Sequence, residues 1–360
     1  MQKWPMLDTF FSTAYSSYYV LRDRKLFEWM LCREDAPDLA NMICAISGDL
    51  LVGIMAYTPT TFFWGDFKTR HYGAWTANWM VLPAYRTGLG WILMRHVQKK
   101  HNILIGHNAG ADNLALAPRL GFTVYDPMPK YIAIFDSTAT NVFLKSLKIH
   151  CSEEVVKGFV FTPRSNSIEK LEPISTPLTE ETYSPDWNLY SPMKFGTVRD
   201  YNYLNHRYFR HPYFNYYILI IGSANQPVVV IYRIEEVSGP SPVKVGRILE
   251  FYHPQHKNGI KQACRAISYV ADFFKNKGCA YSDFFCSSSL YGQTMIDCGF
   301  HLDNTLFFPH RLTPAEAPRL ETCQNLEIYS RITPEAPPLS DCYITKSDGD
   351  QDRPNFYFQG

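Results

Sequence analysis

The chain has 360 residues, of which 46% are hydrophobic and 19% are charged, and its formal net charge is +1. This composition supplies ample material for a packed core and excludes extensive disorder. A charge so close to zero gives no global electrostatic reason to bind nucleic acid or an acidic membrane surface, so we expect small-molecule partners. Two domains of moderate size are the natural organisation for this length.

The N-terminal stretch MQKWPMLDTFFSTAYSSYYV has no basic segment followed by a clean apolar one, and no window reaches eighteen consecutive apolar residues. We therefore expect no export signal and no membrane insertion, and we predict a cytoplasmic protein. Nine cysteines without a C-x-x-C pair indicate reduced thiols, and we predict neither a disulfide framework nor a metal site. The sequence does not indicate an oligomeric state.

The first half of the chain alternates short strands with helices. Apolar runs at 42–48 and 50–57 flank a Gly-Asp turn, which predicts a hairpin. Periodicity and glycine positions then predict, in chain order, a strand at 74–82, a helix at 88–100, a strand at 102–107, a helix at 111–120 that stops at Gly121, and strands at 122–126 and 131–136.

A fainter copy of this order follows in the second half. The expected elements are an aromatic helix at 201–214, a hairpin of strands 216–223 and 227–236, a strand at 245–254, a helix at 260–278, a strand at 279–286, a helix at 290–300 and a last strand near 306–308. The helix at 290–300 ends in Cys-Gly-Phe, where the first half has Leu-Gly-Phe at 120–122.

Two copies of one α+β fold are the simplest account of these patterns. We predict a first domain over 1–140, a connecting segment over 141–195, a second domain over 196–330 and a C-terminal arm over 331–360. In that arm, Asp348, Asp350 and Asp352 resemble the opening of a calcium-binding loop, but Arg353 stands where glycine is required. We expect these aspartates to be solvated; the alternative is that DQDRPN (350–355) folds back over the cleft.

The segment from Arg86 to Gly90 lies where a predicted strand turns into a predicted helix. Glycine lets the backbone approach a ligand, and the unpaired N–H groups at a helix N-terminus bind anions. A phosphate or diphosphate is therefore the predicted ligand. The spacing of Gly88 and Gly90 fits neither the P-loop nor the G-x-G-x-x-G pattern. The alternative is that both glycines serve only a tight connection.

The string VLPAYRTGLG at 81–90 resembles the signature [RQ]-x-x-G-x-[GA] of the GNAT acyl-CoA N-acyltransferase superfamily. Arg86 stands one residue closer to the glycines than in that pattern, whereas Tyr85 as the first position keeps the spacing. The Leu-Gly-Phe element and the order of strands and helices agree with the resemblance, which covers about residues 40–136 and, more loosely, 215–308. It implies two tandem GNAT-like domains, each a mixed, mostly antiparallel, twisted sheet flanked by helices.

The resemblance also implies acyl-CoA as a co-substrate. We expect its pantetheine arm along the strand at Met80 and Val81, and its diphosphate on the corner that follows. The residues predicted for that corner are Arg86, Thr87, Gly88, Leu89, Gly90 and Trp91. The corresponding turn of the second half, HPQHKNGIKQA at 253–263, has only Gly259, so we expect no coenzyme in that copy.

Forming an amide from a thioester requires a proton acceptor for the amine, a donor to the carbonyl and a route for the thiolate to leave. In many GNAT relatives a tyrosine four residues before the glycine of the Leu-Gly-Phe element protonates the thiolate, and Ala117 stands there in this chain. We predict His107, with Asn108, as the base or as an orienting group. His71 and Asn78 are the other candidates, and a purely structural His107 is the alternative reading.

The second half is expected to supply walls for the acceptor. Arg207, within NHRYFRHP (205–212), suits a phosphate, although this helix can instead pack its aromatics inward. Glu250, Tyr252 and His253 end a predicted strand and are expected to reach an acceptor in the interdomain cleft.

Size, charge and the aromatic second half resemble two-domain superfamily members that acylate amino-sugar nucleotides for surface polysaccharides. The sequence therefore favours an N-acyltransferase acting on the amine of a dTDP- or UDP-linked amino sugar. Two alternatives stay open. One is acylation of a peptide or an amino acid, and the other is a non-catalytic acyl-CoA-binding protein.

Overall fold

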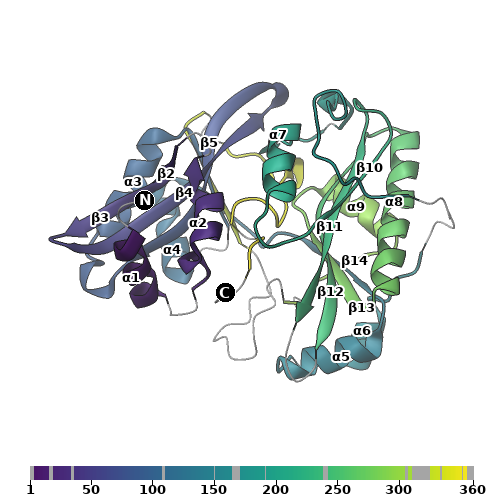
Figure 1. The fold of residues 1–360 in the computed structure, drawn as a ribbon. Helices are drawn as coiled ribbons and strands as arrows, with labels where there is room; N and C mark the ends of the chain where they lie inside the picture. Colours follow the sequence, from purple (N-terminus) through teal and green to yellow (C-terminus); the bar gives the residue numbers. More distant parts are fainter. Residues whose placement is uncertain are drawn as a thin grey trace.

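Two mixed sheets, each with helices packed on it, stand side by side in the computed structural model (Figure 1). The structure describes residues 4–15, 19–33, 36–107, 110–149, 151–163, 171–190, 192–237, 242–304, 307–309, 325–332, 335–350 and 352–354. Most strand pairs in both sheets are antiparallel, and each sheet also contains parallel neighbours. The predicted α+β class with two flanked, mostly antiparallel sheets is confirmed.

The first sheet is built around two long neighbouring strands, β4 (Leu50–Trp64) and β5 (Asp66–Val81). Within the described residues its order is β16-β9-β4-β5-β6-β15-β7, and β3 also pairs with β4. The other members are β3 (Met42–Ser47), β6 (Ile103–His107), β7 (Phe122–Tyr125), β9 (Phe195–Thr197), β15 (Leu326–Ser330) and β16 (Cys342–Tyr343). A separate short pair joins β1 (Cys32–Arg33) to β2 (Ala36–Ala40).

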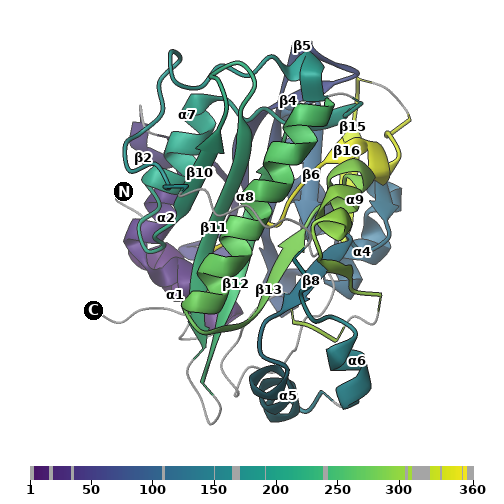
Figure 2. The ribbon, with the colours of Figure 1, turned by 90° about the vertical axis from the view of Figure 1, so that its right-hand side faces the viewer.

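The second sheet has the order β10-β11-β12-β13-β8-β14 in the described part of the chain. Its strands are β8 (Lys130–Ile134), β10 (Tyr217–Ile221), β11 (Val228–Val237), β12 (Val243–Tyr252), β13 (Cys279–Phe285) and β14 (His301–Leu302). Figure 2 shows α8 (Lys257–Asn276) lying along this sheet, with α9 (Ser289–Asp297) beside it.

Successive side chains of β4 point to opposite faces of the first sheet and contact different helices there. Ile54 and Ala56 pack in one apolar cluster with α1 (Trp4–Ala14) and α2 (Arg24–Leu31). Met55 and Tyr57 pack in another with α3 (Leu89–Lys100).

The remaining helices are α4 (Ala111–Leu116), α5 (Ser137–Ser146), α6 (Glu153–Lys157), α7 (Tyr201–Leu204) with a π-helix at Asn205–Phe209, and short 3₁₀ turns at Val20–Arg22, Pro83–Tyr85, Pro118–Leu120, Trp187–Tyr190 and Leu339–Asp341.

Most predicted elements are present, and the differences concern their ends. Two strands are longer than expected: β4 continues past residue 57 to Trp64 and pairs there with β9, and β5 begins at Asp66 rather than at 74. Gly121 and Gly278 end helices as expected, and both adopt the left-handed backbone conformation that glycine favours. The strand predicted near 306–308 is not found there. The last strand of the second sheet is β14 at His301–Leu302, Phe307 and Phe308 lie outside any strand, and residue 306 lies outside the described residues.

The two sheets exchange strands. β8, which the periodicity groups with the first half, pairs with β13 and β14 of the second sheet. In return, β15 inserts between β6 and β7 of the first sheet, and β16 pairs with β9. The grouping of the 131–136 strand with the first copy is therefore wrong, while the division at residues 140, 195 and 330 stays a prediction.

The C-terminal segment is buried between the sheets, and the expectation of solvated aspartates is wrong. Asp348, Asp350 and Asp352 are all at most 7% exposed. Figure 1 shows this yellow segment running between the two halves of the molecule. Asp352 accepts hydrogen bonds from Arg233 at 2.9 Å and from the Tyr216 hydroxyl at 2.6 Å. The alternative, that the segment folds back into the cleft, describes the structure better.

Arg199 is the centre of the buried ion cluster that holds this segment. It follows β9 of the first sheet, and its Nε donates to both oxygens of Glu250 on β12, at 3.0 and 2.9 Å. Its Nη2 donates to Asp348 at 2.6 Å. Tyr208 and Tyr343 donate hydroxyl hydrogen bonds to the same glutamate. One guanidinium thus joins a loop after the first sheet, a strand of the second and the C-terminal segment.

Glu327 on β15 is a buried acid within the first sheet, 5% exposed and facing Gly106 of β6. A Cβ at position 106 would lie 2.7 Å from the Glu327 Cγ, so only glycine fits beneath this side chain. Burial raises the pKa of Glu327 from 4.5 to about 7. The folded protein therefore binds this proton more tightly than the unfolded chain does.

We predict that Arg199→Met lowers the free energy of unfolding by about 3–5 kcal/mol, because it leaves Glu250 and Asp348 buried without their cation. Denaturant unfolding monitored by circular dichroism measures the loss. Lys194→Met is the matched control: its ion pair with Asp341 spans 2.8 Å, but the lysine side chain is 57% exposed. The control should cost less than about 1 kcal/mol. Equal losses in the two variants would contradict the assignment.

We also predict that Glu327→Gln stabilises the fold at pH 8 and has little effect at pH 4. Between about 4.5 and about 7 the folded state keeps a proton that the unfolded state has lost, so native stability falls as the pH rises through this window. The full penalty, about 3 kcal/mol at most, is present above the folded pKa and is removed by the neutral amide. Unfolding curves of both proteins from pH 4 to 8 measure the difference. Glu236→Gln, with a side chain 70% exposed, is the control. If the stability difference between Glu327→Gln and the wild type does not vary with pH, the prediction is wrong.

Candidate functional site

The corner between β5 and α3 is shaped by a proline and two glycines. β5 ends at Val81, the turn Pro83–Tyr85 reverses the chain, and Gly88 forms the N-cap of α3 with φ of 88°. This φ lies in the left-handed region, so a side chain at position 88 would be strained. Because Gly88 has no side chain to cap the helix, the first N–H groups of α3 keep their hydrogen-bonding capacity for another partner.

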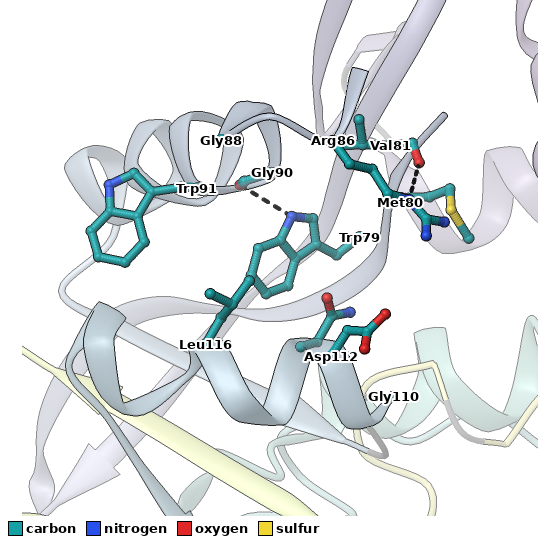
Figure 3. A pocket seen from close by; sticks show the side chains of 11 residues that line it. Trp79, Met80, Val81, Arg86, Gly88, Gly90, Trp91, Gly110, Asp112 and Leu116 are labelled. Carbon is teal, nitrogen blue, oxygen red and sulfur yellow. Dashed lines mark hydrogen bonds between the residues drawn. The ribbon is translucent and has the colours of Figure 1, made fainter. Parts of the chain in front are cut away.

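A cavity of about 490 Å³ lies against this corner (Figure 3). Its lining residues come from the end of β5, the corner, α3 and α4, and they are Trp79, Met80, Val81, Arg86, Gly88, Gly90, Trp91, Gly110, Asp112, Asn113 and Leu116. Six of the eight residues predicted for the coenzyme line this cavity. Thr87 and Leu89 belong to the same corner without lining the cavity.

Trp79 fixes the inner wall of the cavity. Its indole N–H donates to the Gly90 carbonyl at 3.1 Å, as Figure 3 shows. A Cβ at position 90 would lie 3.3 Å from the indole nitrogen. This contact is tight, so glycine at 90 lets the indole lie against the first turn of α3 without a shift. Arg86 is exposed, and its Nε donates to the Val81 carbonyl at 3.1 Å, which places its positive charge beside the cavity.

The opposite wall is α4, which the sequence predicted as a helix but not as part of the site. Asp112, Asn113 and Leu116 face the cavity from this helix. Asp112 lies in the first turn of α4, where its negative charge is favoured by the helix dipole. The position of this helix directly after β6 could have indicated that it borders the cavity. No residue pattern in the sequence marked Asp112, Asn113 or Leu116 as lining residues.

Strands β5 and β6 pair in parallel only at Ala74 with Leu104 and at Trp75 with Ile105. Beyond these pairs no ladder joins the two strands, which leaves a free stretch on each facing edge. At its start the Thr76 hydroxyl donates to the Ile105 carbonyl at 3.2 Å. Asn78 lies on this free stretch as the extra residue of a β-bulge against β4, with φ of 49°. The Tyr19 hydroxyl donates to its Oδ1, while its Nδ2 is buried without a hydrogen-bond partner among the described residues.

His107 ends β6 beside this gap and is 8% exposed. Its ring stacks on Trp75 with centroids 4.7 Å apart. Asn108, predicted with it, lies outside the described residues. His71 also lies on β5, but seven residues before Asn78, about 20 Å along an extended strand. The structure therefore brings His107 and Asn78 to the same gap and leaves His71 far from it.

A second cavity of about 500 Å³ opens between the first sheet and the elements that precede the second. Its walls come from α2, β4, β5, the α7 and π-helix segment and the C-terminal segment, which meet near the centre of Figure 1. The lining residues are Trp29, Met30, Cys32, Asn41, Thr58, Pro59, Thr60, Trp75, Asn202, Tyr203, His206, Arg207, Arg210 and Gly349. Of the residues predicted for the acceptor, only Arg207 is among them.

The other predicted acceptor residues lie in the core rather than on a cavity wall. Glu250, Tyr252 and His253 each have 0% exposure. Glu250 binds Arg199, the Tyr252 hydroxyl lies 2.6 Å from that of Tyr183, and His253 Nε2 lies 3.2 Å from the Thr294 hydroxyl. Burial lowers the pKa of His253 to about 4, which keeps the ring neutral. The sequence placed these residues at a strand end, and long-range packing against the C-terminal segment covers that end.

The position at which many GNAT relatives have a tyrosine is buried in this structure. Ala117 is 1% exposed and lies in the apolar cluster beneath α3, so no acid stands there. Within the described residues no group of three or more His, Cys, Asp or Glu side chains is arranged to hold a metal. None of the described helices combines the length and the apolar character needed to cross a membrane.

The sequence matches no family model and no curated protein. Solved structures with a similar fold do exist. The N-myristoyltransferase of Saccharomyces cerevisiae with bound myristoyl-CoA has a TM-score of 0.53 and 9% identity, over 94% of this chain and 77% of that chain. Its structure with myristoyl-CoA and inhibitors has a TM-score of 0.55 and 9% identity, over 94% and 79%.

A third similar structure is a GCN5-related N-acetyltransferase from Anabaena variabilis ATCC 29413. Its TM-score is 0.54 and its identity 13%, over 91% of this chain and 70% of that chain. At such low identity the similarity establishes the fold alone. The chain has a GNAT-like fold with two sheets.

Proposed function

We propose that this protein is an acyl-CoA-dependent N-acyltransferase. The observation that carries the proposal is the cavity at the uncapped N-terminus of α3, bordered by Arg86 and by glycines at 88 and 90. Free N–H donors and the positive end of a helix dipole are the physical requirements of a diphosphate site. The neighbouring structures with bound myristoyl-CoA have the same fold, which supports the choice of ligand.

In this proposal the coenzyme diphosphate lies on the amides of residues 89–91, because the Gly88 amide already donates to the Arg86 carbonyl at 2.8 Å. The pantetheine arm follows Met80 and Val81 into the gap between β5 and β6. The amides of pantetheine then pair with the strand edge that β6 leaves free. Asp112 stands on the α4 side of the cavity and disfavours phosphate there, so the diphosphate is directed to the α3 side.

The thioester carbonyl is placed beside the bulge at Asn78. A bulged residue has no ladder partner, so its N–H and its side-chain Nδ2 are available as donors to developing negative charge. His107, across the gap and stacked on Trp75, is the candidate to accept the proton of the attacking amine. With Ala117 in the place of the usual acid, the thiolate, whose ordinary pKa is near 8.5, leaves without a proton donor at that position.

The acceptor is placed in the second cavity. Trp75 lines this cavity and Trp79 lines the first, so the two linings lie about 13 Å apart along β5. The sequence-based acceptor is an amino sugar linked to a nucleotide, and the alternative is an amino acid or a peptide. Only one of the four residues predicted for the sugar nucleotide lines the cavity. An amino acid or a peptide is therefore as well supported as an amino-sugar nucleotide.

The proposed function is tested by incubating the protein with acetyl-CoA and longer acyl-CoA esters, together with dTDP- and UDP-amino sugars, amino acids and short peptides. Release of free thiol that depends on the amine is the expected result. Tight acyl-CoA binding without release for any amine indicates the non-catalytic alternative. Absence of both binding and release contradicts the proposal.

We predict that Gly90→Val raises the dissociation constant of coenzyme A at least tenfold, about 1.4 kcal/mol. The branched side chain pushes against the Trp79 indole and narrows the cavity at the first turn of α3. Isothermal titration calorimetry measures the change. His96→Val, on an exposed position further along the same helix, controls for effects on helix propensity. Unchanged binding in the Gly90 variant argues against the assignment.

A further inference from the structure

Arg207 differs from the other buried arginines in the described part of the chain. Arg199, Arg233 and Arg247 each have a carboxylate oxygen within 4 Å. Arg207 is equally buried, at 7% exposure, and has no such ion pair. Its Nε and Nη2 are buried without a hydrogen-bond partner among the described residues. Burying these donors without an acceptor costs free energy, which indicates that a partner is missing.

The two unpartnered atoms define the geometry of that partner. Nε and Nη2 lie on one edge of the guanidinium, and their N–H bonds run nearly parallel. This edge binds both oxygens of a carboxylate, or two oxygens of a phosphate, in a bidentate pair. Trp29 presents its ring to the guanidinium in a cation–π contact, with 5.3 Å between the Arg207 Cζ and the ring centroid.

The surroundings of Arg207 also favour an anion. The side chain lines the second cavity, whose described lining residues include Arg210 and His206 but no aspartate or glutamate. Asp352 is a carboxylate whose charge acts on Arg207, and it already binds Arg233 and the Tyr216 hydroxyl. That carboxylate is thus occupied, and the fork of Arg207 stays available to a molecule in the cavity.

We propose that the acceptor amine carries an anionic group, a carboxylate or a phosphate, that binds the Nε and Nη2 of Arg207. This inference rests on the proposed function and names the class of its acceptor. With the anion at Arg207, the rest of the acceptor extends along the cavity to Trp75, the ring on which His107 stacks. The amine then meets the thioester at the gap between β5 and β6.

The test compares matched acceptors at saturating acyl-CoA. One pair is an amino acid and its amide, and the other is an amino-sugar phosphate and the neutral amino sugar. The wild-type protein should prefer the anionic member of at least one pair about tenfold or more in kcat/KM, and the preferred pair distinguishes carboxylate from phosphate. Equal use of anionic and neutral acceptors overturns the inference but leaves the proposed function intact.

Arg207→Met should lower kcat/KM for the preferred anionic acceptor by roughly 10- to 100-fold, the loss expected for one charge-assisted pair. It should change kcat/KM for the neutral acceptor and the dissociation constant of acyl-CoA by less than about threefold. A change of that size is smaller than the contribution of one charge-assisted hydrogen-bonded pair. Arg70→Met, on an exposed position of β5, is the matched control. Arg207→Lys keeps the charge but not the fork, and should recover only part of the preference. A uniform loss with both acceptors contradicts the inference.

A binding measurement decides the inference even if no amine is acylated. Calorimetric titration of the wild-type protein and of Arg207→Lys with inorganic phosphate and with acetate compares the anion site directly. Weaker binding in the variant supports the site. Binding that is absent in the wild type, or equal in both proteins, overturns it, whereas failure of every amine in the transfer assay counts against the proposed function.

Discussion

The early separation of β5 from β6 is the constraint on which the site depends. The two strands pair in parallel only at Ala74 with Leu104 and at Trp75 with Ile105, and beyond these pairs no ladder joins them. Unpaired backbone on facing strand edges is costly unless a ligand or another chain satisfies it. Two cavities adjoin this stretch, one against α3 and α4 and one facing α2 and α7. A gap between two cavities is the geometry required to bring an acyl donor and an acceptor together from opposite sides.

The buried ion cluster around Arg199 keeps the two sheets in place around that gap. Arg199 joins Glu250 of the second sheet to Asp348 of the C-terminal segment, while β8 and β15 cross from one half of the chain to the sheet of the other. Buried ion pairs contribute little net stability, but the loss of one partner is costly. The arrangement therefore favours one relative position of the sheets, and it places Gly349 of the C-terminal segment on the wall of the second cavity.

Local patterns were sufficient to predict the strand-to-helix corner at residues 86–91, and distant contacts were needed for the rest. Gly88 and Gly90 after an apolar strand predicted the cavity against α3 because both walls of that corner are close in sequence. Glu250 and His253 were misplaced because a strand end looks open until distant parts of the chain cover it. Tyr343 donates to Glu250, and the Thr294 hydroxyl lies 3.2 Å from His253 Nε2. Asp348 and Asp352 looked solvated because their cationic partners are more than a hundred residues away. Trp29 and Trp75 gave no local signal, since the second cavity joins three distant parts of the chain.

A structure of the protein with bound coenzyme A tests the central claim most directly. The account predicts electron density for the diphosphate within hydrogen-bonding distance of the amides at residues 89–91, with the pantetheine arm entering the gap between β5 and β6. Density for the coenzyme at any other place, or an α3 corner that stays without ligand at saturating concentration, would contradict it.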